Sequence, residues 1–461
     1  MGFKNLLKKL APSFLITWYH FLMAFLGAIL YQFPSRKLKV IGVTGTNGKT
    51  TVVEMITKIL EEADYKVAVL NSIKFKIGKK ELPNELRMTM PGRFFIQRFL
   101  RQAADTGCKY AVLEVTSEGI KQYRHKFIDF EAAVLTNLTP EHIEAHKGFE
   151  NYKKAKGKLF EAAKNIHIIN LDDENAVYFL KIPSKQKLCY SINSHLKIES
   201  LKIDWKLKIE NWKFIKAADI QTTPQGISFV VENIPFNLHL LGGFNVYNAL
   251  AAISVGISQG IDSKICKSAV ERIEGIPGRM ELVISEPFKV FVDYAFTPNA
   301  LQKVYETLSG IFNFQFSISK QIPNSKFKKP KLICVLGACG GGRDKWKRPV
   351  LGEIAAKYCD EIIVTNEDPY DENPQHILNQ IESGFSQIPN SKFQIPNYRK
   401  ILDRREAIRK SLELAKPNDI IIITGKGCEP SICVAGGKRI LWDDREVTKE
   451  EFKKLNQKNL S

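Results

Sequence analysis

The segment that most constrains the fold is residues 39–51, with the sequence KVIGVTGTNGKTT. Its apolar run of Val40, Ile41 and Val43 is typical of a buried parallel strand. A glycine-rich turn and Gly-Lys-Thr-Thr follow, and residues 52–60 have the pattern of an amphipathic helix. Strand, loop and helix start form a phosphate cradle, because free backbone N–H groups and the positive end of the helix dipole face the anion. The segment therefore predicts a nucleotide-phosphate site.

The loop departs from the standard P-loop spacing, because Val43 stands where that pattern has its first glycine. Lys49 is suited to the outer phosphates of a nucleotide, and the hydroxyl of Thr50 is suited to Mg²⁺. A plain glycine turn is the alternative, which Gly-Lys-Thr-Thr in a strand–helix context disfavours. The loop residues expected to contact the nucleotide are Gly45, Thr46, Asn47, Gly48, Lys49, Thr50 and Thr51.

Apolar runs after the loop alternate with helical or loop segments, which predicts a parallel, doubly wound sheet. Ligands of such sheets lie at the carboxyl ends of the strands. Glu114 ends one predicted strand, and residues 136–142, with the sequence TNLTPEH, follow the next. A carboxylate, an imidazole and the Thr50 hydroxyl suit Mg²⁺ beside phosphates. The predicted strands are residues 66–70, 110–115, 132–136 and 167–170.

The alternation restarts near Pro277, which predicts a second α/β domain. Its predicted strands are residues 290–293, 331–336, 361–365 and 419–424. The unit QIPNSKF occurs at 321–327 and 387–393, with a partial copy at 394–397, and its Pro and Asn predict exposed loop insertions. The expected organisation is an apolar N-terminal helix (1–37), a central nucleotide-binding domain (38–275) and a C-terminal domain (276–461).

A strongly apolar stretch, residues 14–33, precedes the nucleotide strand. As a helix it would be roughly 30 Å long, enough to cross a hydrocarbon core. Basic residues flank it on both sides, and no small-residue cleavage site of a signal peptide comes before the nucleotide loop. Three interpretations stay open: a membrane anchor, a helix lying in the membrane interface, and a helix packed on the domain or on a partner subunit.

The formal net charge of +19 and the pI near 9.4 fit anionic substrates, an anionic membrane face, nucleic acid, or lysines spread over a solvated surface. No basic run is interleaved with aromatic residues, which disfavours nucleic acid. The eight cysteines include no Cys-x-x-Cys pair, which disfavours a zinc ribbon and a secreted disulfide framework. We therefore expect reduced cysteines in a cytoplasmic protein, with association to the inner face of the cell membrane left open by the apolar stretch.

A series of further motifs accompanies the glycine loop along the chain. They are GTNGKTT at 45–51, LEVTSEG at 113–119, TNLTPEH at 136–142, YKKAKGKLF at 152–160, GFNVYNALAA at 243–252, IPGRME at 276–281, VDYAFTPNA at 292–300, GGGRDKWKRP at 340–349 and GKGCE at 425–429. Their order resembles the Mur ligases, the ATP-dependent amino-acid ligases of peptidoglycan synthesis, and within them the UDP-N-acetylmuramoyl-tripeptide synthetase type. The resemblance runs from about residue 38 to about residue 450.

The resemblance implies an ATP-dependent acid–amino-acid ligase that adds a free amino acid to a UDP-muramoyl-peptide-like precursor. A carboxylate of the precursor attacks the γ-phosphate of ATP, giving an acyl phosphate and ADP, and the amine then displaces phosphate. The resemblance also implies ATP and Mg²⁺ as cofactors and an α/β fold. In that fold a P-loop-type parallel-sheet domain carries the ATP, and a C-terminal Rossmann-like domain closes over it and presents the amino acid.

Roles for individual residues follow from the matching motifs. Lys49 would bind the β- and γ-phosphates, and Thr50, Glu114 and His142 would coordinate Mg²⁺. Lys156 matches the family lysine that is carbamylated and so becomes a carboxylate-like metal ligand. Further nucleotide contacts are expected from Asn245, Asn248, Arg279 and Asp293. Contacts to the muramoyl substrate are expected from Thr89, Thr116, Gln122 and Arg124, and contacts to the amino acid from Asp368 and Glu429.

Four departures from the family pattern bear on specificity. Fewer than forty residues precede the nucleotide strand, so we expect the N-terminal UDP-binding domain to be absent, which makes a lipid-linked acceptor or a helper subunit conceivable. Phe296 and Cys428 each stand where the family has His. Tyr370 stands where enzymes that use meso-diaminopimelate have Arg, and loss of that bidentate carboxylate clamp disfavours diaminopimelate and leaves lysine or another amine open.

Two other functions are alternatives to the Mur-type ligase. A folylpolyglutamate-synthase-like ligase also lacks the N-terminal domain, but Thr51 and the Asn-Val-Tyr-Asn segment at 245–248 argue against it. A membrane-tethered nucleotide-binding scaffold without ligase activity is the candidate from a different class. The retained phosphate-loop lysine, metal-binding positions and carbamylation position argue against a scaffold.

Overall fold

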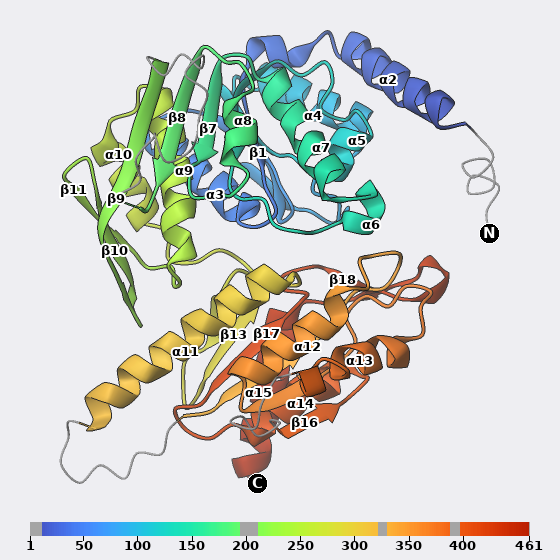
Figure 1. The fold of residues 1–461 in the computed structure, drawn as a ribbon, viewed down its shortest axis with the longest axis vertical. Coiled ribbons are helices and arrows are strands. Elements are labelled where there is room, and N and C mark those ends of the chain that lie inside the picture. The colour runs from blue at the N-terminus through green and yellow to red at the C-terminus, as the bar shows by residue number, and fades with distance from the viewer. Residues whose placement is uncertain (1–11, 194–210, 321–329, 388–396, 461) are drawn as a thin grey trace.

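The computed structural model describes residues 12–193, 211–320, 330–387 and 397–460. Figure 1 shows two halves, each built on its own sheet, with helix α2 (Ser13–Leu30) extending from the upper half. The copies of QIPNSKF fall almost wholly outside the described residues, so the expected loop insertions stay a prediction.

The upper half is organised around an eleven-stranded sheet within the described residues, in the order β11-β10-β9-β8-β7-β6-β1-β5-β2-β3-β4. Its centre is parallel, and the apolar side chains of these strands are buried on both faces. The parallel strands are β1 (Lys39–Thr44), β2 (Val67–Leu70), β5 (Tyr110–Glu114), β6 (Phe130–Leu135), β7 (Ile166–Asn170) and β8 (Gln186–Ser191). The predicted parallel sheet is confirmed for this centre.

Antiparallel strands complete both edges of this sheet, which the predicted alternation did not include. On one side lie β3 (Lys74–Ile77) and β4 (Lys80–Pro83). On the other side β9 (Trp212–Thr223) pairs with β8 in parallel and forms an antiparallel meander with β10 (Gly226–Val231) and β11 (Ile234–Leu238). Antiparallel neighbours need only short turns, so β3, β4, β10 and β11 add to the sheet without the crossover helices that mark a parallel unit.

Helices cover both faces of the upper sheet, as a doubly wound fold requires. One face packs against α3 (Lys49–Glu62), α9 (Phe244–Ser258) and α10 (Ser263–Glu271). The opposite face packs against α4 (Arg93–Asp105), α7 (Phe149–Ala162) and α8 (Ala176–Leu180). The short helices α5 (Ser117–Lys121) and α6 (Ile143–His146) lie near the carboxyl ends of the strands.

The lower half repeats this design with a six-stranded sheet within the described residues, in the order β12-β13-β17-β14-β15-β16. All pairs are parallel except β12 with β13. The strands are β12 (Glu281–Ile284), β13 (Lys289–Asp293), β14 (Leu332–Leu336), β15 (Glu361–Val364), β16 (Asn397–Lys400) and β17 (Ile420–Thr424).

A small antiparallel pair, β18 (Ser431–Cys433) and β19 (Arg439–Leu441), lies apart from the six-stranded sheet. The helices are α11 (Pro298–Lys320), α12 (Lys347–Tyr358), α13 (Pro374–Glu382), α14 (Arg404–Leu414) and α15 (Asp444–Leu460).

The prediction that the cysteines are reduced is wrong for one pair. Cys334 on β14 and Cys359 after α12 form a disulfide. β14 and the end of α12 adjoin in space, which brings together two thiols that stand 25 residues apart in the sequence. The other cysteines are free thiols, at positions 108, 189, 266, 339, 428 and 433.

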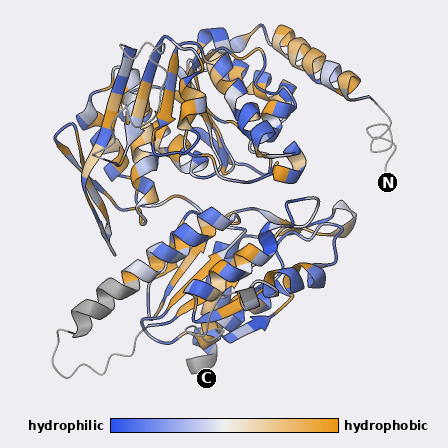
Figure 2. Cartoon of the chain, viewed as in Figure 1, coloured by the Kyte–Doolittle hydropathy of each residue, from blue (hydrophilic) through white to orange (hydrophobic). Residues whose placement is uncertain are grey.

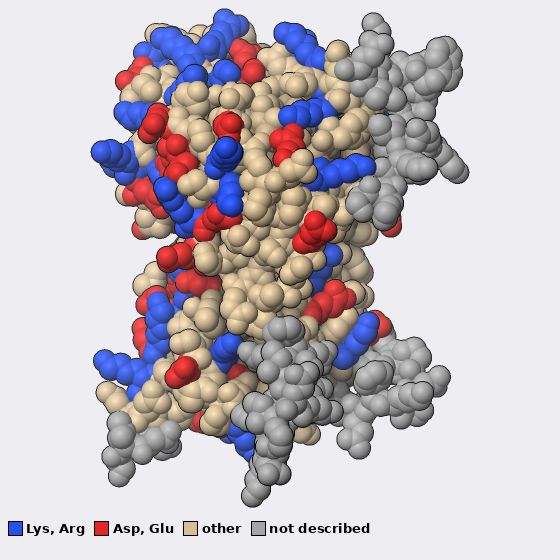
Figure 3. All heavy atoms as spheres, turned by 90° about the vertical axis from the view of Figure 1, so that its left-hand side faces the viewer, with Lys and Arg blue, Asp and Glu red and all other residues tan. Residues whose placement is uncertain are grey.

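The surface is uneven in its polarity. Figure 3 shows basic and acidic side chains interspersed over the face that it presents, which agrees with lysines spread over a solvated surface. Figure 2 shows helix α2, at the opposite side of the upper half, as a mostly apolar segment. Within the described residues, no helix combines the length and the apolar content needed to cross a membrane.

Candidate active site

A cavity of about 1080 Å³ lies where the two halves meet. Its walls include the carboxyl end of β5, the start of α3 and, from the lower half, the end of β13. The sequence-predicted site residues that line it are Thr46, Asn47, Gly48, Lys49, Thr50, Thr51, Thr89, Glu114, Thr116, Arg124, His142, Asn245, Asn248, Arg279, Asp293, Asp368 and Glu429. Gly45, Gln122 and Lys156 are not among the lining residues.

The loop between β1 and α3 needs glycine at two positions. Gly45 and Gly48 both have positive φ, of 150° and 80°. A Cβ atom at Gly45 would lie 1.9 Å from the Thr136 hydroxyl oxygen, and one at Gly48 would lie 2.4 Å from Oδ1 of Asn248. The loop thus packs against two other segments of the upper half, which leave no room for a side chain at either glycine.

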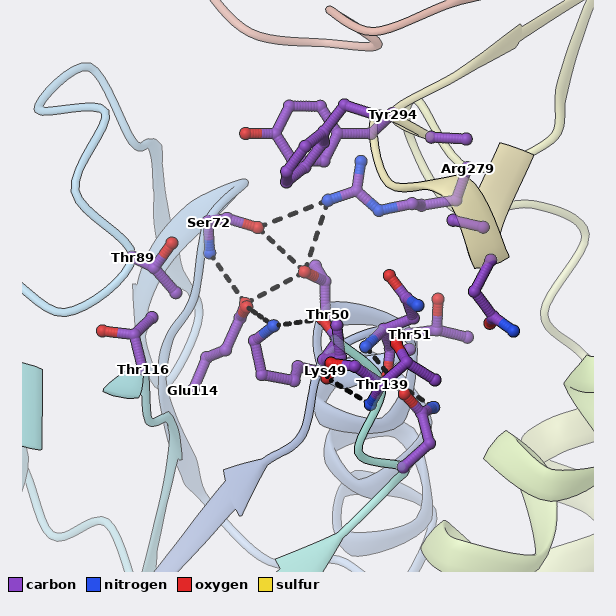
Figure 4. Close-up of a pocket in the computed structure, with 18 of the residues that line it drawn as sticks. Lys49, Thr50, Thr51, Ser72, Thr89, Glu114, Thr116, Thr139, Arg279 and Tyr294 are labelled. Atoms are coloured by element: carbon purple, nitrogen blue, oxygen red, sulfur yellow. Dashed lines mark hydrogen bonds and ion pairs between the residues drawn. The ribbon is translucent and has the colours of Figure 1, made fainter. Parts of the chain in front are cut away.

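A compact polar cluster surrounds the start of α3, and Figure 4 shows its members converging from separate elements. The Thr50 hydroxyl donates to Oε2 of Glu114 at 2.9 Å and lies 2.8 Å from the Ser72 hydroxyl. The backbone N–H of Ser72 donates to the same carboxylate oxygen at 3.1 Å. Arg279 reaches in from the lower half, with Nη2 at 3.4 Å from both hydroxyl oxygens.

Two cationic groups, Lys49 and Arg279, lie against these oxygens, which makes the cluster electrostatically suited to the anionic phosphates of a nucleotide. Nζ of Lys49 lies 3.9 Å from Oε1 of Glu114 and donates to the Thr46 carbonyl at 2.9 Å. Burial lowers the pKa of Lys49, although Glu114 opposes that shift. Among the residues that the structure describes, no three His, Cys, Asp or Glu side chains gather into a metal site of their own. A metal ion here would therefore draw on the Thr50 hydroxyl, the Glu114 carboxylate and the phosphates of a nucleotide.

The segment after β6 packs on the phosphate loop. The Asn137 side chain accepts from the Asn47 N–H at 2.9 Å and donates to its carbonyl at 3.1 Å. His142, at the end of this segment, has φ of +56° and lines the cavity. Burial and then the nearby cations, first Arg343, lower the pKa of His142 to about 2, so its imidazole is neutral and has a lone pair available to a metal.

Lys156 lies behind the phosphate loop rather than on the cavity wall. It is one of the most deeply buried side chains of α7, and its Nζ donates to the Gly45 carbonyl at 2.7 Å. Burial, and then the charge of Lys49, hold the pKa of Lys156 well below its usual range. This shift favours the neutral amine, which is the form that reacts with CO₂. The other lysines of this helix, at 153, 154 and 158, are more exposed.

The four further residues that are predicted to contact the nucleotide lie on two sides of the phosphate loop. Asn245 and Asn248 are buried on α9, where Nδ2 of Asn248 donates to Oδ1 of Asn245 at 2.8 Å. The Arg279 guanidinium stacks on the Tyr294 ring at 4.5 Å. The Asp293 carboxylate accepts two backbone N–H groups at 2.6 Å, and burial raises its pKa to about 6 although Arg279 opposes the shift.

The residues predicted for the muramoyl substrate lie on one side of the cavity. The Thr116 hydroxyl accepts from the Gly119 N–H at 3.1 Å and so caps α5. Arg124 donates to the Met90 carbonyl and to Oε1 of Gln122, the latter at 2.7 Å. Gln122 therefore holds Arg124 in place instead of lining the cavity, which is a difference from the expected direct contact.

Asp368 and Glu429, the carboxylates predicted to contact the amino acid, belong to a dense network of buried charges, which lies at what we name the amino-acid end of the cavity. Nη2 of Arg87, from the upper half, donates to Asp368 at 2.6 Å and to Glu429 at 2.5 Å. Lys426 contacts both carboxylates, at 3.0 Å in the case of Asp368, and the Tyr294 hydroxyl donates to Glu429 at 2.7 Å. Burial alone would raise the pKa values of Asp368 and Glu429, but Lys426 and Arg87 hold both below their ordinary values.

The three departures from the family motifs each have a defined environment. The ring of Phe296 lies 4.9 Å from Nζ of Lys347, where an aromatic face suits a buried ammonium better than a second cation would. Tyr370, with φ of +51°, packs over Gly341, and a Cβ atom at that glycine would meet the tyrosine ring. The Cys428 thiol faces the Pro277 carbonyl at 3.4 Å.

Sequence reasoning missed two residues of this site. Ser72 follows directly on β2, so the rule that ligands lie at the carboxyl ends of parallel strands could have found it. Arg87 stands in a loop, 281 residues before its partner Asp368 in the chain, and carries no local signal of its role. Both become recognisable only when the sheet order and the contact between the halves are known.

Comparison with known proteins agrees with this geometry. Residues 43–256 match the Mur ligase middle domain, and residues 278–427 match the domain described as Mur ligase, glutamate ligase domain. A UDP-N-acetylmuramoyl-L-alanyl-D-glutamate–2,6-diaminopimelate ligase of Syntrophomonas wolfei is 36% identical over 433 residues, covering 93% of this chain and 81% of the relative. A UDP-N-acetylmuramyl-tripeptide synthetase of Roseiflexus sp. is 32% identical over 458 residues, covering 94% and 82%. A solved structure of a ligase with the same description as the first relative gives a TM-score of 0.56 at 29% identity, covering 91% of this chain and 79% of that chain.

Proposed function

Because this chain belongs to the Mur ligase family, we propose that it is an ATP-dependent ligase that joins a free amino acid to a UDP-muramoyl-peptide precursor of peptidoglycan. The observation that carries the proposal is the cavity between the halves. Most of the phosphate loop, three of the four proposed muramoyl contacts (Thr89, Thr116 and Arg124) and the Asp368 and Glu429 carboxylates line it. The residues proposed to hold the three reactants therefore face a shared space, as an amide ligase requires.

The chemistry proceeds in two steps. A carboxylate oxygen of the acceptor attacks the γ-phosphorus of ATP, the bond from that phosphorus to the β–γ bridging oxygen breaks, and ADP leaves. The amine nitrogen of the amino acid then attacks the acyl carbon, loses a proton and expels inorganic phosphate. In the first step Lys49 and the loop N–H groups bind the phosphate oxygens, and Arg279 brings a second cation from the lower half.

Mg²⁺ would neutralise phosphate charge in this site and help to hold the phosphates in line. The Thr50 hydroxyl and the Glu114 carboxylate would hold it, and the neutral imidazole of His142 is a further donor. We also propose that Lys156 is carbamylated, because its buried amine has a lowered pKa and lies directly behind the phosphate loop. Carbamylation would turn this amine into an anion beside the cations of the loop.

For the amino acid we propose a diamino acid. Asp368 and Glu429 are two buried carboxylates whose pKa values are lowered, so they are suited to meet an ammonium group. The names of the two relatives specify diaminopimelate in one case and leave the amino acid open in the other. Tyr370 supplies no guanidinium for a distal carboxylate, so L-lysine is to be tested together with meso-diaminopimelate.

The test is ADP release by the purified full chain, with UDP-muramoyl-peptide acceptors crossed with L-lysine, meso-diaminopimelate and D-glutamate. Turnover that depends on one acceptor and one diamino acid is the expected result. Turnover with a folate acceptor and glutamate would support the folylpolyglutamate-type alternative. Absence of turnover with every soluble acceptor, together with binding of ATP, would favour a lipid-linked acceptor or the scaffold alternative.

The role of Lys156 has its own test. We expect Lys156→Ala to reduce turnover by about 100-fold or more, because one metal-bound ligand is lost. Lys154→Ala, on the exposed side of the same helix, is the matched control and should stay within about twofold of the wild type. A carbamate carbon signal should appear in the wild type with ¹³C-labelled CO₂ and vanish in Lys156→Ala. A fully active variant, or the absence of that signal, would refute the proposed carbamylation.

We further propose that the chain works at the inner face of the cell membrane, with helix α2 as the contact. The support is its apolar surface, which the next subsection develops.

A further inference from the structure

Helix α2 presents an apolar surface that this molecule leaves uncovered. Its large exposed side chains are Phe14, Leu15, Trp18, Tyr19, Phe21, Leu22, Phe25, Leu26, Ile29 and Leu30, of which Trp18 is 67% exposed and Leu30 is 63% exposed. The helix contains no Asp, Glu, Lys or Arg between Ser13 and Leu30, and His20 is its one residue of a basic type. An apolar surface of this extent marks a site of contact with a membrane or with another protein.

The helix is nevertheless fixed to the upper half. Ala24 and Ala28 are buried, and a Cβ atom at Gly27 would lie 3.7 Å from the Phe94 backbone on α4. Phe21 and Phe25 pack their ring edges on Phe127, with centroids 5.2 and 5.3 Å apart. The side of α2 that packs on the upper half therefore carries small residues with Phe21 and Phe25 at its border, and most of the large apolar side chains lie outside that contact.

Basic side chains predominate in the segments that adjoin α2. Arg36 and Lys37 follow the helix, Arg98 stands on α4, and Lys126 adjoins Phe127; all four are exposed. Arg36 has one acidic neighbour, Asp129 at 3.6 Å, across a solvent-exposed gap. In the sequence, Lys4, Lys8 and Lys9 precede the helix. Cations around an apolar face complement a surface that has a hydrocarbon interior and anionic headgroups.

The helix also adjoins the acceptor side of the cavity. Nη2 of Arg93, at the start of α4, contacts Nδ1 of His20 on α2 and donates to the Gln122 carbonyl at 2.6 Å. The Gln122 side chain in turn holds Arg124, which lines the cavity. A short chain of polar contacts thus joins α2 to the residues proposed to bind the muramoyl substrate.

We propose that α2 lies in the plane of an anionic phospholipid surface, with Leu15, Trp18, Leu22 and Ile29 directed into the lipid, and that this contact holds the acceptor side of the cavity next to the membrane. The second part rests on the proposed function, whereas the first part depends only on α2 and its surroundings. The side of α2 that would face water in an isolated interfacial helix is covered here by α4. Trp18 and Tyr19 are the residue types that favour the headgroup level.

A protein partner fits this surface less well. Interfaces between proteins carry a polar rim with hydrogen bonds around an apolar centre. On α2 the exposed side chains are apolar over nearly the whole length of the helix, Thr17 being an exception, and exposed cations outnumber exposed acidic groups in the adjoining segments. A fluid lipid surface needs no matching rim, and its anionic headgroups pair with those cations.

The test is co-sedimentation of the full chain with vesicles of phosphatidylglycerol and phosphatidylcholine, without any substrate. We expect binding to mixed anionic vesicles, weaker binding at higher salt, and little binding to pure phosphatidylcholine. The fluorescence of Trp18 should shift to the blue and be quenched by brominated lipid, and Trp18→Phe should lose that quenching. This measurement leaves the helix surface apolar and therefore does not depend on a disruptive variant.

Two matched double variants each replace two exposed apolar residues by aspartate, one pair on α2 and one pair on β19. Trp18→Asp with Leu22→Asp should reduce vesicle binding at least tenfold, whereas Ile440→Asp with Leu441→Asp, on exposed β19, should leave it unchanged. The midpoint temperature of thermal unfolding should be the same for the wild type and for both double variants. ADP release with a soluble acceptor should stay within about twofold in the α2 variant, so that loss of membrane binding and loss of ligase activity are separate results.

Several outcomes would overturn the proposal. One is the absence of binding to every vesicle; another is equal binding by the α2 variant. A concentration-dependent dimer that the α2 variant abolishes, with no vesicle binding, would assign the surface to a second copy of this chain. Vesicle binding with no ADP release from any acceptor would support the membrane contact and count against the proposed function alone.

Discussion

At the scale of single residues, Arg87 illustrates how the two halves share a site. Its backbone has φ of +53°, which is uncommon for a residue with a side chain, and its guanidinium donates to acceptors on the opposite half. Nη1 adds contacts at 3.3 Å to the Ser431 hydroxyl and at 2.6 Å to the Cys433 sulfur. The loop that carries Thr89 is thereby tied to the carboxylates of the amino-acid end.

Arg87→Ala should lower kcat/KM for the amino acid about tenfold or more, because it leaves two buried carboxylates with Lys426 as the remaining cation. Arg87→Lys should lose less, since it keeps the charge but cannot bridge the same acceptors. KM for ATP should stay within about twofold. Steady-state ADP release with the amino acid varied provides the measurement, and Arg101→Ala, in an exposed ion pair, is the control. Unchanged amino-acid kinetics in Arg87→Ala would show that the network is structural only.

At the scale of elements, α7 explains how a lysine-rich helix contributes a buried amine. Four lysines occur between residues 153 and 158, a composition that suggests a charged, solvent-facing side of the helix. Most of them do lie on such a side. The buried positions of the helix are Tyr152, Ala155, Lys156, Gly157, Leu159 and Phe160. Lys156 therefore stands in the middle of the apolar stripe, one turn from Tyr152 and from Phe160, and helical periodicity alone turns it toward the phosphate loop.

Helix α14 offers a test of local stability that is independent of the active site. Oδ1 of Asp403 accepts from the Glu406 N–H at 2.8 Å and caps the helix. Asp403→Ala should destabilise this end by about 1 kcal/mol, which corresponds to about fivefold faster hydrogen exchange of the amides in the first turn. Asp403→Asn keeps a capping oxygen and should exchange at nearly the wild-type rate. Equal exchange in all three proteins would mean that tertiary contacts, rather than the cap, fix the start of α14.

At the scale of the whole molecule, the segment after His142 connects the chemistry to the contact between the halves. The Asp344 carboxylate of the lower half accepts from the N–H groups of Ile143 and Glu144, at 3.2 and 3.1 Å. The buried pair of Lys347 and Glu141, at 3.0 Å, lies beside these contacts. The proposed metal-binding imidazole is thus fixed by residues of the other half, which couples its position to closure of the cavity.

Asp344→Ala should therefore reduce kcat about tenfold or more, because the two N–H groups lose their acceptor and the halves lose a direct contact. Small-angle scattering with an ATP analogue should give a larger radius of gyration for this variant than for the wild type. Lys345→Ala, at the adjacent exposed position, should match the wild type in both measurements. A variant that turns over normally and is as compact as the wild type would contradict this coupling.

The sequence alone determined the elements that depend on local chemistry. Apolar periodicity predicted the parallel strands, since buried strands require continuous apolar runs. The glycines at 45 and 48 predicted the phosphate loop, because their backbone conformations exclude side chains. The ordered motifs predicted the family, and its match over both halves confirms that.

Only the tertiary structure decided the features that join distant parts of the chain. The antiparallel strands at the sheet edges, the disulfide between Cys334 and Cys359, and the position of Lys156 behind the loop all depend on sheet order and helix packing. Arg87 reaches its carboxylates only because the two halves meet there, hundreds of residues apart in sequence. For α2, the sequence supplied an apolar helix, whereas packing on α4 decided which side is buried and which is left exposed. Local pattern fixes what a segment can form, but its neighbours in space decide which of its faces the molecule uses.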